Sequence, residues 1–146
     1  MNPKKILLVE DNPDDVELTR IAFAEAGSEH QLTVVSDGAE AVEYLLGKGK
    51  YAGRDVADLP TVVLLDLNLP KLDGREVLQA IRGETATRNL PVVVLTTSAE
   101  PFDVEQVYAL GANSYIQKPV EFERFVEVVR QIGLYWLALN QPPTKP

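Results

Sequence analysis

The chain of 146 residues contains no cysteine and a single histidine, His30. The lack of cysteine excludes disulfide bonds and thiolate metal sites, and it is compatible with a reducing compartment. One histidine cannot by itself build a catalytic triad or a histidine-based metal site. Because His30 falls between a predicted helix and a predicted strand, we interpret it as a surface residue.

Positive charge is also scarce, since the formal net charge is −8 and no block of lysine and arginine occurs. This composition argues against nucleic acid or an anionic membrane surface as a partner, and small cations are the better electrostatic match. Long apolar runs are missing as well. Only residues 6–9 follow Lys4 and Lys5 as an apolar run, too few for a signal peptide or a membrane span. We therefore expect a cytoplasmic protein.

The chain does contain several short apolar runs. Residues 6–9, 62–65 and 91–95 are continuously apolar, which suits strands that are covered on both faces. Weaker patterns predict strands at 32–36 and 114–116. Helical spacing and end signals predict helices from Pro13 to a stop at Gly27 and over residues 39–46, 75–82, 103–110 and 121–139.

The alternation of these strands and helices predicts an α/β fold, in which a doubly wound, five-stranded parallel sheet carries helices on both faces. The length fits one domain, which we place at residues 1–139, followed by a proline-rich tail at 140–146. Residues 48–60 are polar and lack periodicity, so they predict a surface loop, and the sequence does not reveal its role.

Four predicted strands are followed by polar residues, namely Asp11, Asp66, Thr96 and Lys118. In such a sheet, ligands bind beyond the carboxyl ends of the strands, where the strand order reverses. We therefore expect these side chains, together with Glu10, to converge on one crevice. Each also has a structural interpretation: the paired acids as helix caps, the threonine as a strand residue and the lysine as a surface residue. Turn residues would rarely be sorted in this way by chance, so we favour the functional interpretation.

Glu10, Asp11 and Asp66 would bring three negative charges together, which is costly unless a hard cation compensates them. Mg²⁺ is the natural candidate, because it prefers oxygen ligands and joins carboxylates to phosphoryl groups. The Lys118 ammonium can pair with Asp66 or with a phosphoryl oxygen, and the Thr96 hydroxyl can donate a hydrogen bond to another such oxygen. The set predicts phosphoryl transfer with Asp66 as the nucleophile.

Five landmarks occur in order along the chain: the acidic pair Glu10-Asp11, Asp66 in LLDLNLPKLDG, Thr96 in VVVLTTS, Tyr115 in ANSYIQKP, and Lys118-Pro119. With these landmarks, residues 4–139 resemble the receiver domain of two-component response regulators. The resemblance implies a flavodoxin-like sheet with strand order 2-1-3-4-5. It implies that Asp66 accepts a phosphoryl group from the phosphohistidine of a histidine kinase. It also implies Mg²⁺, with Mn²⁺ as a substitute, held by Asp11, Asp66 and the backbone carbonyl of Asn68, while Glu10 acts mostly through water.

The same resemblance implies a conformational switch and a partner. Thr96 and Tyr115 are expected to move together on phosphorylation, and the Lys118–Pro119 peptide bond is expected to be cis. The stretches VEDNPDDVELTR, DGAEAVEYLLG and GANSYIQKPVEFERFVEVV more narrowly resemble single-domain regulators paired with phytochrome histidine kinases. The expected output is contact with a downstream effector or phosphotransfer protein, without enzymatic activity beyond the chain's own phosphotransfer and autodephosphorylation.

One position departs from the family pattern. Many receivers have a small residue directly after the switch threonine, whereas this chain has Thr97. The bulk of Thr97 would narrow access to the phosphoryl group and slow the reaction with small phosphodonors. Asn68 and Ser98 occupy the two positions that tune the attacking water in this family, and their polarity gives no direction for the phosphoryl lifetime.

Two other functions are weighed against this interpretation. A phosphatase of the haloacid-dehalogenase type also uses an aspartyl nucleophile and Mg²⁺, but that chemistry needs a second aspartate two residues on, where this chain has Asn68. A receiver-like interaction module that is never phosphorylated would be expected to have lost site residues, and none is lost here.

The predicted last helix is more apolar than packing on one sheet face requires. At about 100° per residue, a core-facing stripe forms from Phe122, Phe125, Val126, Val129, Ile132, Trp136 and Leu137. Val128, Tyr135 and Leu139 widen the apolar arc to roughly 200°, about twice what one sheet face covers. We therefore predict a homodimer through residues 121–139, and receivers commonly associate through their fourth helix, fifth strand and fifth helix. The alternatives are a tail folded over the helix from Asn140, or a break at Gly133 that tucks residues 134–139 inward.

Overall fold

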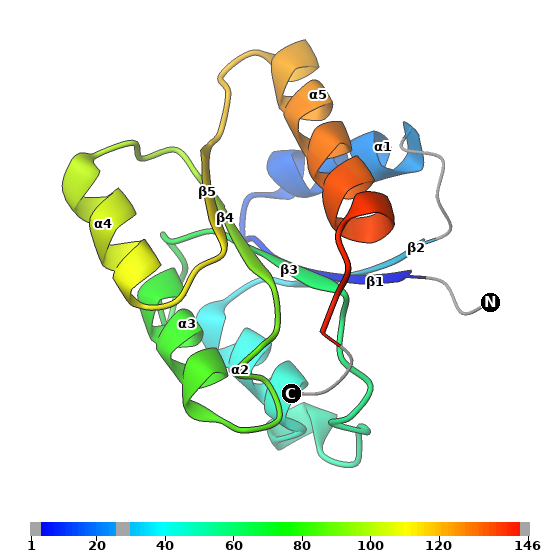
Figure 1. The fold of residues 1–146 in the computed structure, drawn as a ribbon, viewed down its shortest axis with the longest axis vertical. Helices are drawn as coiled ribbons and strands as arrows, with labels where there is room; N and C mark the ends of the chain where they lie inside the picture. The colour runs from blue at the N-terminus through cyan, green and yellow to red at the C-terminus, as the bar shows by residue number, and fades with distance from the viewer. Residues whose placement is uncertain (1–3, 26–29, 144–146) are drawn as a thin grey trace.

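In the computed structural model, which describes residues 4–25 and 30–143, strands and helices alternate around one sheet (Figure 1). The strands are β1 (Lys4–Val9), β2 (His30–Val35), β3 (Val62–Leu65), β4 (Val92–Thr96) and β5 (Ser114–Gln117). The helices are α1 (Pro13–Glu25), α2 (Gly38–Leu46), α3 (Gly74–Gly83), α4 (Pro101–Ala109) and α5 (Phe122–Gly133), with a 3₁₀ turn, η1 (Gly49–Tyr51), and a π-helical segment, η2 (Leu134–Leu139). The helix stop predicted at Gly27 lies outside the described residues.

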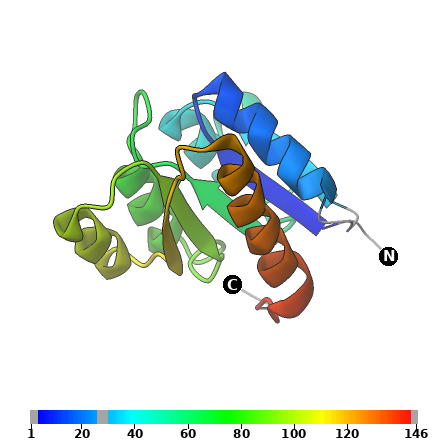
Figure 2. The ribbon, with the colours of Figure 1, turned by 90° about the horizontal axis from the view of Figure 1, so that it is seen from above.

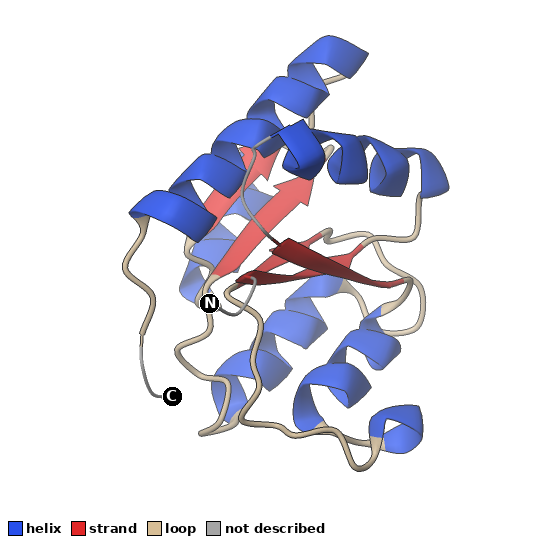
Figure 3. Ribbon diagram, turned by 90° about the vertical axis from the view of Figure 1, so that its right-hand side faces the viewer, coloured by secondary structure: helices blue, strands red, loops and turns tan. Residues whose placement is uncertain are grey.

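The sheet has the order β2-β1-β3-β4-β5, and each neighbouring pair is parallel, which confirms the predicted fold class. Helices α1 and α5 cover one face, and α2, α3 and α4 cover the other (Figure 3). On their face, α1 and α5 lie side by side (Figure 2). The strand order reverses between β1 and β3, so the ligand crevice of this fold is expected at the carboxyl ends of these strands.

The central strand β3 shows why the apolar runs lack alternation. Val63 and Leu65 pack into the core on the side of α2 and α3, whereas Val62 and Leu64 pack into the core on the side of α1 and α5. All four side chains are fully buried. Because successive side chains of a strand point to opposite faces, a strand with a core on each face needs an unbroken apolar run.

The loop at residues 48–60 is fastened to the end of α2 by Arg54. The Arg54 guanidinium donates hydrogen bonds to the carbonyl oxygens of Tyr44 at 2.5 Å and Leu45 at 3.1 Å, and it lies over the Tyr44 ring. These carbonyls belong to the last turn of α2, where no intrahelical donor is available. Gly47 ends the helix with a φ of 65°, a left-handed conformation that suits glycine. The loop therefore caps a helix.

The core-facing stripe of the last helix is largely as predicted. Five of its residues are buried and Trp136 packs against the same core, the buried ones being Phe125, Val126, Val129, Ile132 and Leu137. The prediction for Phe122 is wrong, since it is 58% exposed. Phe122 is the first residue of α5 and precedes the turns that pack on the sheet.

The helix does not break at Gly133 but continues through η2, where Asn140 N–H donates to the Tyr135 carbonyl. Tyr135 and Leu139 remain 48% and 76% exposed. The described part of the tail leads to the amino-terminal ends of β3 and β4 and lines a pocket of about 400 Å³ there. Over the described residues, neither alternative covers the exposed side of the helix, and the homodimer stays a prediction.

None of the described helices is long and apolar enough to cross a membrane.

Candidate functional site

Glu10 and Asp66 extend β1 and β3 by one residue at the carboxyl edge of the sheet. The Glu10 N–H donates to the Val35 carbonyl at 3.0 Å, and the Asp66 N–H donates to the Val9 carbonyl at 3.1 Å. Both acids are buried, with exposures of 4% and 8%. The hydrogen bonds of the parallel sheet therefore fix both backbones and bring the two carboxylates to one place.

The start of α3 packs directly against the Asp66 backbone. Gly74 N–H donates to the Leu67 carbonyl at 2.8 Å, and a Cβ at Gly74 would lie only 2.4 Å from the Asp66 carbonyl oxygen. Asp73 forms a capping box with Glu76 at this helix end. Asp73 is thus the cap, and Gly74 the first residue, of a helix that supports Asp66.

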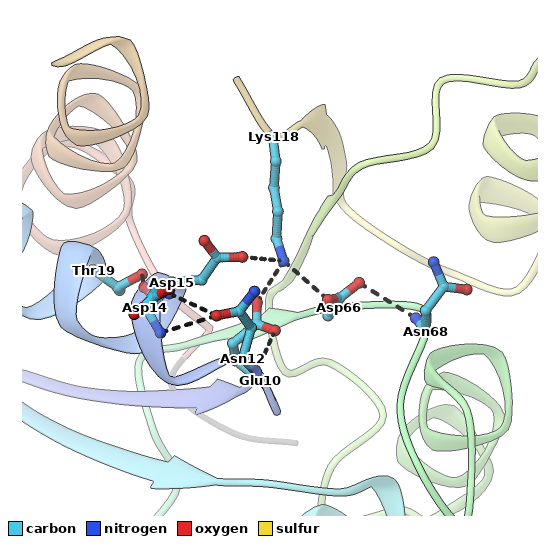
Figure 4. A network of polar contacts seen from close by, with 8 residues as sticks. All are labelled: Glu10, Asn12, Asp14, Asp15, Thr19, Asp66, Asn68 and Lys118. Atoms are coloured by element: carbon cyan, nitrogen blue, oxygen red, sulfur yellow. Dashed lines mark hydrogen bonds and ion pairs between the residues drawn. The ribbon is translucent and has the colours of Figure 1, made fainter. Parts of the chain in front are cut away.

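The Lys118 ammonium lies at the centre of the site (Figure 4). It donates one hydrogen bond each to Glu10 Oε1 at 2.6 Å, Asp15 Oδ2 at 2.9 Å and Asp66 Oδ2 at 2.9 Å. The Lys118 side chain is 6% exposed, so the ammonium itself is largely shielded from water. All three N–H donors of the ammonium are therefore used by carboxylates.

The Lys118–Pro119 bond is trans, since no cis peptide bond occurs among the described residues, and the expectation of a cis bond is wrong for this structure. Trans is the favoured isomer before proline by about 0.5–1 kcal/mol. The trans chain already brings Lys118 Nζ to Asp66, and Lys118 N–H donates to the Thr96 carbonyl at 2.6 Å.

Thr96 and Tyr115 lie on the neighbouring strands β4 and β5. Thr96 is fully buried, and its Oγ1 is the one buried side-chain polar atom of the described residues without a hydrogen-bond partner. Burying a hydroxyl without a partner costs free energy, so this atom is suited to a ligand that completes it. The Tyr115 hydroxyl is satisfied, because it donates to the Ser98 carbonyl at 2.8 Å.

Burial and charge shift two pKa values at the site. Burial raises the pKa of Glu10 from 4.5 to about 7, although the Lys118 ammonium opposes this shift. Burial would lower the pKa of Lys118, but its hydrogen bond to Glu10 and the charges of Glu10 and Asp66 raise that pKa above its ordinary value of 10.5. Lys118 therefore stays charged at neutral pH.

The carboxylates of Glu10, Asp11 and Asp66 form a cluster that fits a divalent cation. Each offers one oxygen, and these oxygens lie within 4.8 Å of one another. Hard oxygen donors are the ligands that Mg²⁺ and Mn²⁺ prefer. Asp11 is exposed, which leaves one side of the cluster open to solvent. Asn68 N–H donates to Asp66 Oδ1 at 3.3 Å, so the Asn68 backbone lies beside the cluster.

Asp15 is a site residue that the sequence interpretation missed. It stands in the first turn of α1, where an acid commonly stabilises the helix end, so its position has an ordinary structural explanation. In the structure, the Asn12 side chain caps α1 by accepting from Asp14 N–H at 2.9 Å and Asp15 N–H at 3.4 Å. The Asp15 carboxylate points instead to Lys118. Its place at the start of a helix that follows the acidic pair was the available signal.

A second polar network next to the site also escaped sequence analysis. Ser98 Oγ donates to Asp103 Oδ2 at 2.6 Å, and Arg75 donates to Asp103 Oδ1 at 2.8 Å and to Gln106 Oε1 at 2.6 Å. These contacts tie the β4–α4 loop and α4 to α3. Thr97, in the same loop, is exposed.

A family model described as the response regulator receiver domain matches residues 6–130. This chain belongs to the response regulator receiver family. Proteins of the family are phosphoacceptor signalling proteins rather than catalytic enzymes, so the phosphatase alternative does not hold. The acidic pocket of Glu10, Asp11 and Asp66 is typical of the phosphoacceptor site of a receiver.

Relatives of the chain include phytochrome response regulators. The crystal structure of the phosphorylated cyanobacterial phytochrome response regulator RcpA is 40% identical and superposes with a TM-score of 0.91, covering 98% of this chain and 100% of that chain. The response regulator Rcp1 of Synechocystis sp. is 39% identical over 92% of this chain and 90% of its own length. Its Mn²⁺-bound crystal structure gives a TM-score of 0.90 at 38% identity, covering 97% of this chain and all of that one.

A further relative does not carry a phytochrome description. The protein described as "Probable methanogenesis regulatory protein FilR2" of Methanothrix harundinacea is 43% identical over 97% of this chain and 89% of its own length. The chain is thus a receiver-domain response regulator related to phytochrome response regulators, and its acidic site fits a divalent cation.

Proposed function

We propose that Asp66 accepts a phosphoryl group from the phosphohistidine of a histidine kinase. The observation that carries this proposal is a buried Thr96 hydroxyl without a partner on the strand next to Asp66, whose carboxylate already pairs with Lys118. Such a hydroxyl and such an ammonium provide the donors that the equatorial oxygens of a transferring phosphoryl group need.

In the proposed transfer, one oxygen of Asp66 forms a bond to phosphorus while the bond from phosphorus to the kinase histidine breaks. The ring nitrogen keeps the electron pair of the broken bond. Lys118 pairs with one phosphoryl oxygen, and the Thr96 hydroxyl donates a hydrogen bond to another. The rigid backbone of Asp66, held by β1 and α3, limits the reorganisation that the step requires.

We propose Mg²⁺ as the divalent cation, with Mn²⁺ as a substitute. Asp11, Asp66 and the backbone carbonyl of Asn68 would hold it, with Glu10 acting through water. Bound there, the cation would offset the charge of the carboxylates and of the incoming phosphoryl group. The oxygen donor set and the Mn²⁺-bound form of Rcp1 support this assignment.

The direct test is incubation of the chain with a phosphorylated histidine kinase. The wild type should become labelled only with a divalent cation present, and Asp66→Asn should stay unlabelled. Asp14→Asn is the matched control, because it removes an exposed carboxylate that makes no described contact with Lys118. Equal labelling of wild type and Asp66→Asn contradicts the assignment of Asp66. An unlabelled wild type favours the alternative of a receiver-like interaction module that is never phosphorylated.

We further propose that Thr96 and Tyr115 transmit the phosphorylation signal. Donation from the Thr96 hydroxyl to the phosphoryl group would draw the following loop toward Asp66. Tyr115 would follow, because its hydroxyl donates to the carbonyl of Ser98 in that loop. Thr96→Ala should keep phosphorylation but alter the phosphorylation-dependent hydrogen exchange of residues 103–119, and unchanged exchange contradicts this route.

A phytochrome-type histidine kinase is the proposed phosphodonor, with a downstream effector or phosphotransfer protein as the recipient of the signal. The relation to RcpA and Rcp1 supports this pairing. Transfer rates from a phytochrome-type kinase and from an unrelated kinase decide the question. A rate from the phytochrome-type kinase that is no higher contradicts the pairing.

We also propose that the chain forms a homodimer through residues 121–139. Phe122, Tyr135 and Leu139 present large exposed apolar side chains along this segment. Light scattering at micromolar concentration should give twice the chain mass of 16.1 kDa for the wild type, and a lower mass for the double variant Tyr135→Asp, Leu139→Asp. A wild-type mass of one chain contradicts the dimer.

A further inference from the structure

Lys118 has no free hydrogen-bond donor for a phosphoryl group. Its three N–H groups are occupied by Glu10, Asp15 and Asp66, at distances between 2.6 and 2.9 Å. An ammonium has three donors and no more. A phosphoryl oxygen that pairs with Lys118 must therefore displace one of these three carboxylates.

The three carboxylates differ in how easily they can be displaced. Glu10 and Asp66 belong to the cation cluster and have side chains 4% and 10% exposed, whereas the Asp15 side chain is 21% exposed and lies outside that cluster. A partly exposed carboxylate regains water when it loses its partner, while a buried one is left without compensation. Asp15 is thus the contact of Lys118 that costs least to break.

The direction of the Asp15 contact adds to this argument. In Figure 4, Asp15 approaches Lys118 from α1, on the side of the ammonium opposite to Asp66. The first turn of α1 stabilises the Asp15 carboxylate whether or not it holds Lys118. Asp15 therefore occupies an N–H donor of Lys118 for which a phosphoryl group at Asp66 would compete.

On the basis of the proposed function, we infer that Asp15 is a positioning residue that acts through Lys118. Asp15 occupies one N–H donor of the ammonium until a phosphoryl group at Asp66 takes its place. The strength of the Asp15 contact sets how tightly the site binds a phosphoryl group. Removing the Asp15 charge should free one N–H donor of Lys118 for the phosphoryl group and strengthen that binding.

Binding of beryllium fluoride, a mimic of the phosphoryl group on aspartate, tests this inference without a kinase. At saturating Mg²⁺, titration calorimetry should show about fivefold tighter binding for Asp15→Asn than for the wild type, the size expected for a partly exposed ion pair. Asp14→Asn is the matched control, because it removes the same charge from the same helix turn, and Asp14 takes part in the described network through its backbone N–H alone. Its affinity should stay within about twofold of the wild type.

A double-variant cycle shows whether the effect passes through Lys118. With Lys118→Ala in place, adding Asp15→Asn should change the affinity no more than adding Asp14→Asn does. A fivefold gain that persists without Lys118 overturns the inference, since it reports general charge. Equal affinities of Asp15→Asn and Asp14→Asn, or weaker binding by Asp15→Asn, overturn it as well.

Failure of the proposed function would look different from failure of this inference. If the folded wild type, checked by circular dichroism, binds no beryllium fluoride with Mg²⁺, the proposed phosphoryl site is wrong and the inference falls with it. If the wild type binds and only the Asp15→Asn effect is missing, the phosphoryl site stands and Asp15 has no positioning role.

Discussion

Lys118 and Arg82 are two cations at opposite edges of the sheet, and they have different kinds of partner. Lys118 lies at the carboxyl edge and contacts carboxylates only. Arg82 lies in the last turn of α3, near the amino-terminal ends of β4 and β5. Its guanidinium contacts neutral oxygens only, namely the carbonyls of Arg88, Leu90 and Gly111 and the side chain of Asn113.

This difference distinguishes a cation of the proposed phosphoryl site from a cation that holds loops together. The acceptors around Arg82 are oxygens of loops that its planar guanidinium holds together. These oxygens carry no net charge, so they do not attract another cation in place of Arg82. The carboxylates around Lys118 repel one another and attract other cations, so their contacts can be exchanged. Burial lowers the pKa of Arg82, whereas the carboxylates raise the pKa of Lys118. The identity of the partners therefore distinguishes the two cations better than their burial.

The largest effect should come from Lys118 in phosphoryl transfer. Lys118→Ala should slow labelling by a phosphorylated kinase by on the order of 100- to 1000-fold, as expected when a donor to developing charge is removed. For Arg82→Ala, measured at a temperature where the variant is folded, the labelling rate should stay within about threefold of the wild type. The described hydrogen bonds of Arg82 do not involve Glu10, Asp66 or Lys118. Similar slowing by both variants would remove the distinction between the two cations.

Arg82 should matter for the stability of the fold rather than for phosphoryl transfer. Arg82→Ala removes four hydrogen bonds to neutral oxygens and should lower the free energy of unfolding by about 2 kcal/mol, or roughly 6 °C in melting temperature. Arg88→Ala, which removes the same charge from an exposed neighbour, should cost less than about 0.5 kcal/mol. Urea unfolding measures both. Mg²⁺ should not restore the Arg82→Ala loss, and a restoration would link Arg82 to the acidic site.

A smaller effect is expected from the carboxylates themselves. Without divalent cations, Asp11→Asn should raise the free energy of unfolding by about 0.5–1 kcal/mol, because it relieves repulsion within the acidic cluster. The same variant should lose most of the stabilisation that Mg²⁺ gives the wild type. Melting curves with and without Mg²⁺ test both statements, and a destabilised Asp11→Asn in cation-free buffer contradicts the first.

The sequence predicted what depends on the strands. Apolar runs and the acids that follow them are local signals, and a parallel sheet brings strand ends together in a known way. Glu10, Asp66 and Lys118 could therefore be grouped without coordinates. The fold class was predictable for the same reason, whereas the strand order followed from the family resemblance alone.

What the sequence did not predict depends on contacts that side chains make between distant elements. Such contacts are made by Asp15, Arg54 and Arg82, and their partners are brought near by the path of a loop or the length of a helix. In the sequence alone, each of these three residues can equally be an ordinary surface residue. The exposure of Phe122 was missed because an ideal helical wheel does not say where the helix meets the sheet. The trans Lys118–Pro119 bond shows that a family feature need not hold in this chain's structure.

A third cation, Lys50, sharpens the comparison at the low end of the energy scale. Its ammonium pairs with Glu40 at 2.7 Å, yet its side chain is 65% exposed. Glu40 also accepts from Ser36 N–H at 3.0 Å and from the Tyr51 hydroxyl at 2.8 Å. The hydrogen bond from Lys50, followed by that from Ser36, lowers the pKa of Glu40 from 4.5 to about 2. The ion pair therefore favours the charged forms of both Glu40 and Lys50, but solvent screens their attraction at the surface.

A comparably small effect is predicted for the stability of the protein in acid. Because the folded state lowers the pKa of Glu40, the charged carboxylate stabilises the protein above pH 4.5, and this contribution is lost as the pH falls toward about 2. Glu40→Gln should lower the free energy of unfolding by about 1 kcal/mol at pH 7, and the difference from the wild type should shrink below pH 4.5. Glu105→Gln, an exposed change on α4, should stay within about 0.5 kcal/mol. Urea unfolding at pH 7, 4.5 and 3 measures the difference in the free energy of unfolding between the wild type and Glu40→Gln. A difference that stays constant across this range would show that the shape of Glu40, rather than its charge, stabilises the protein.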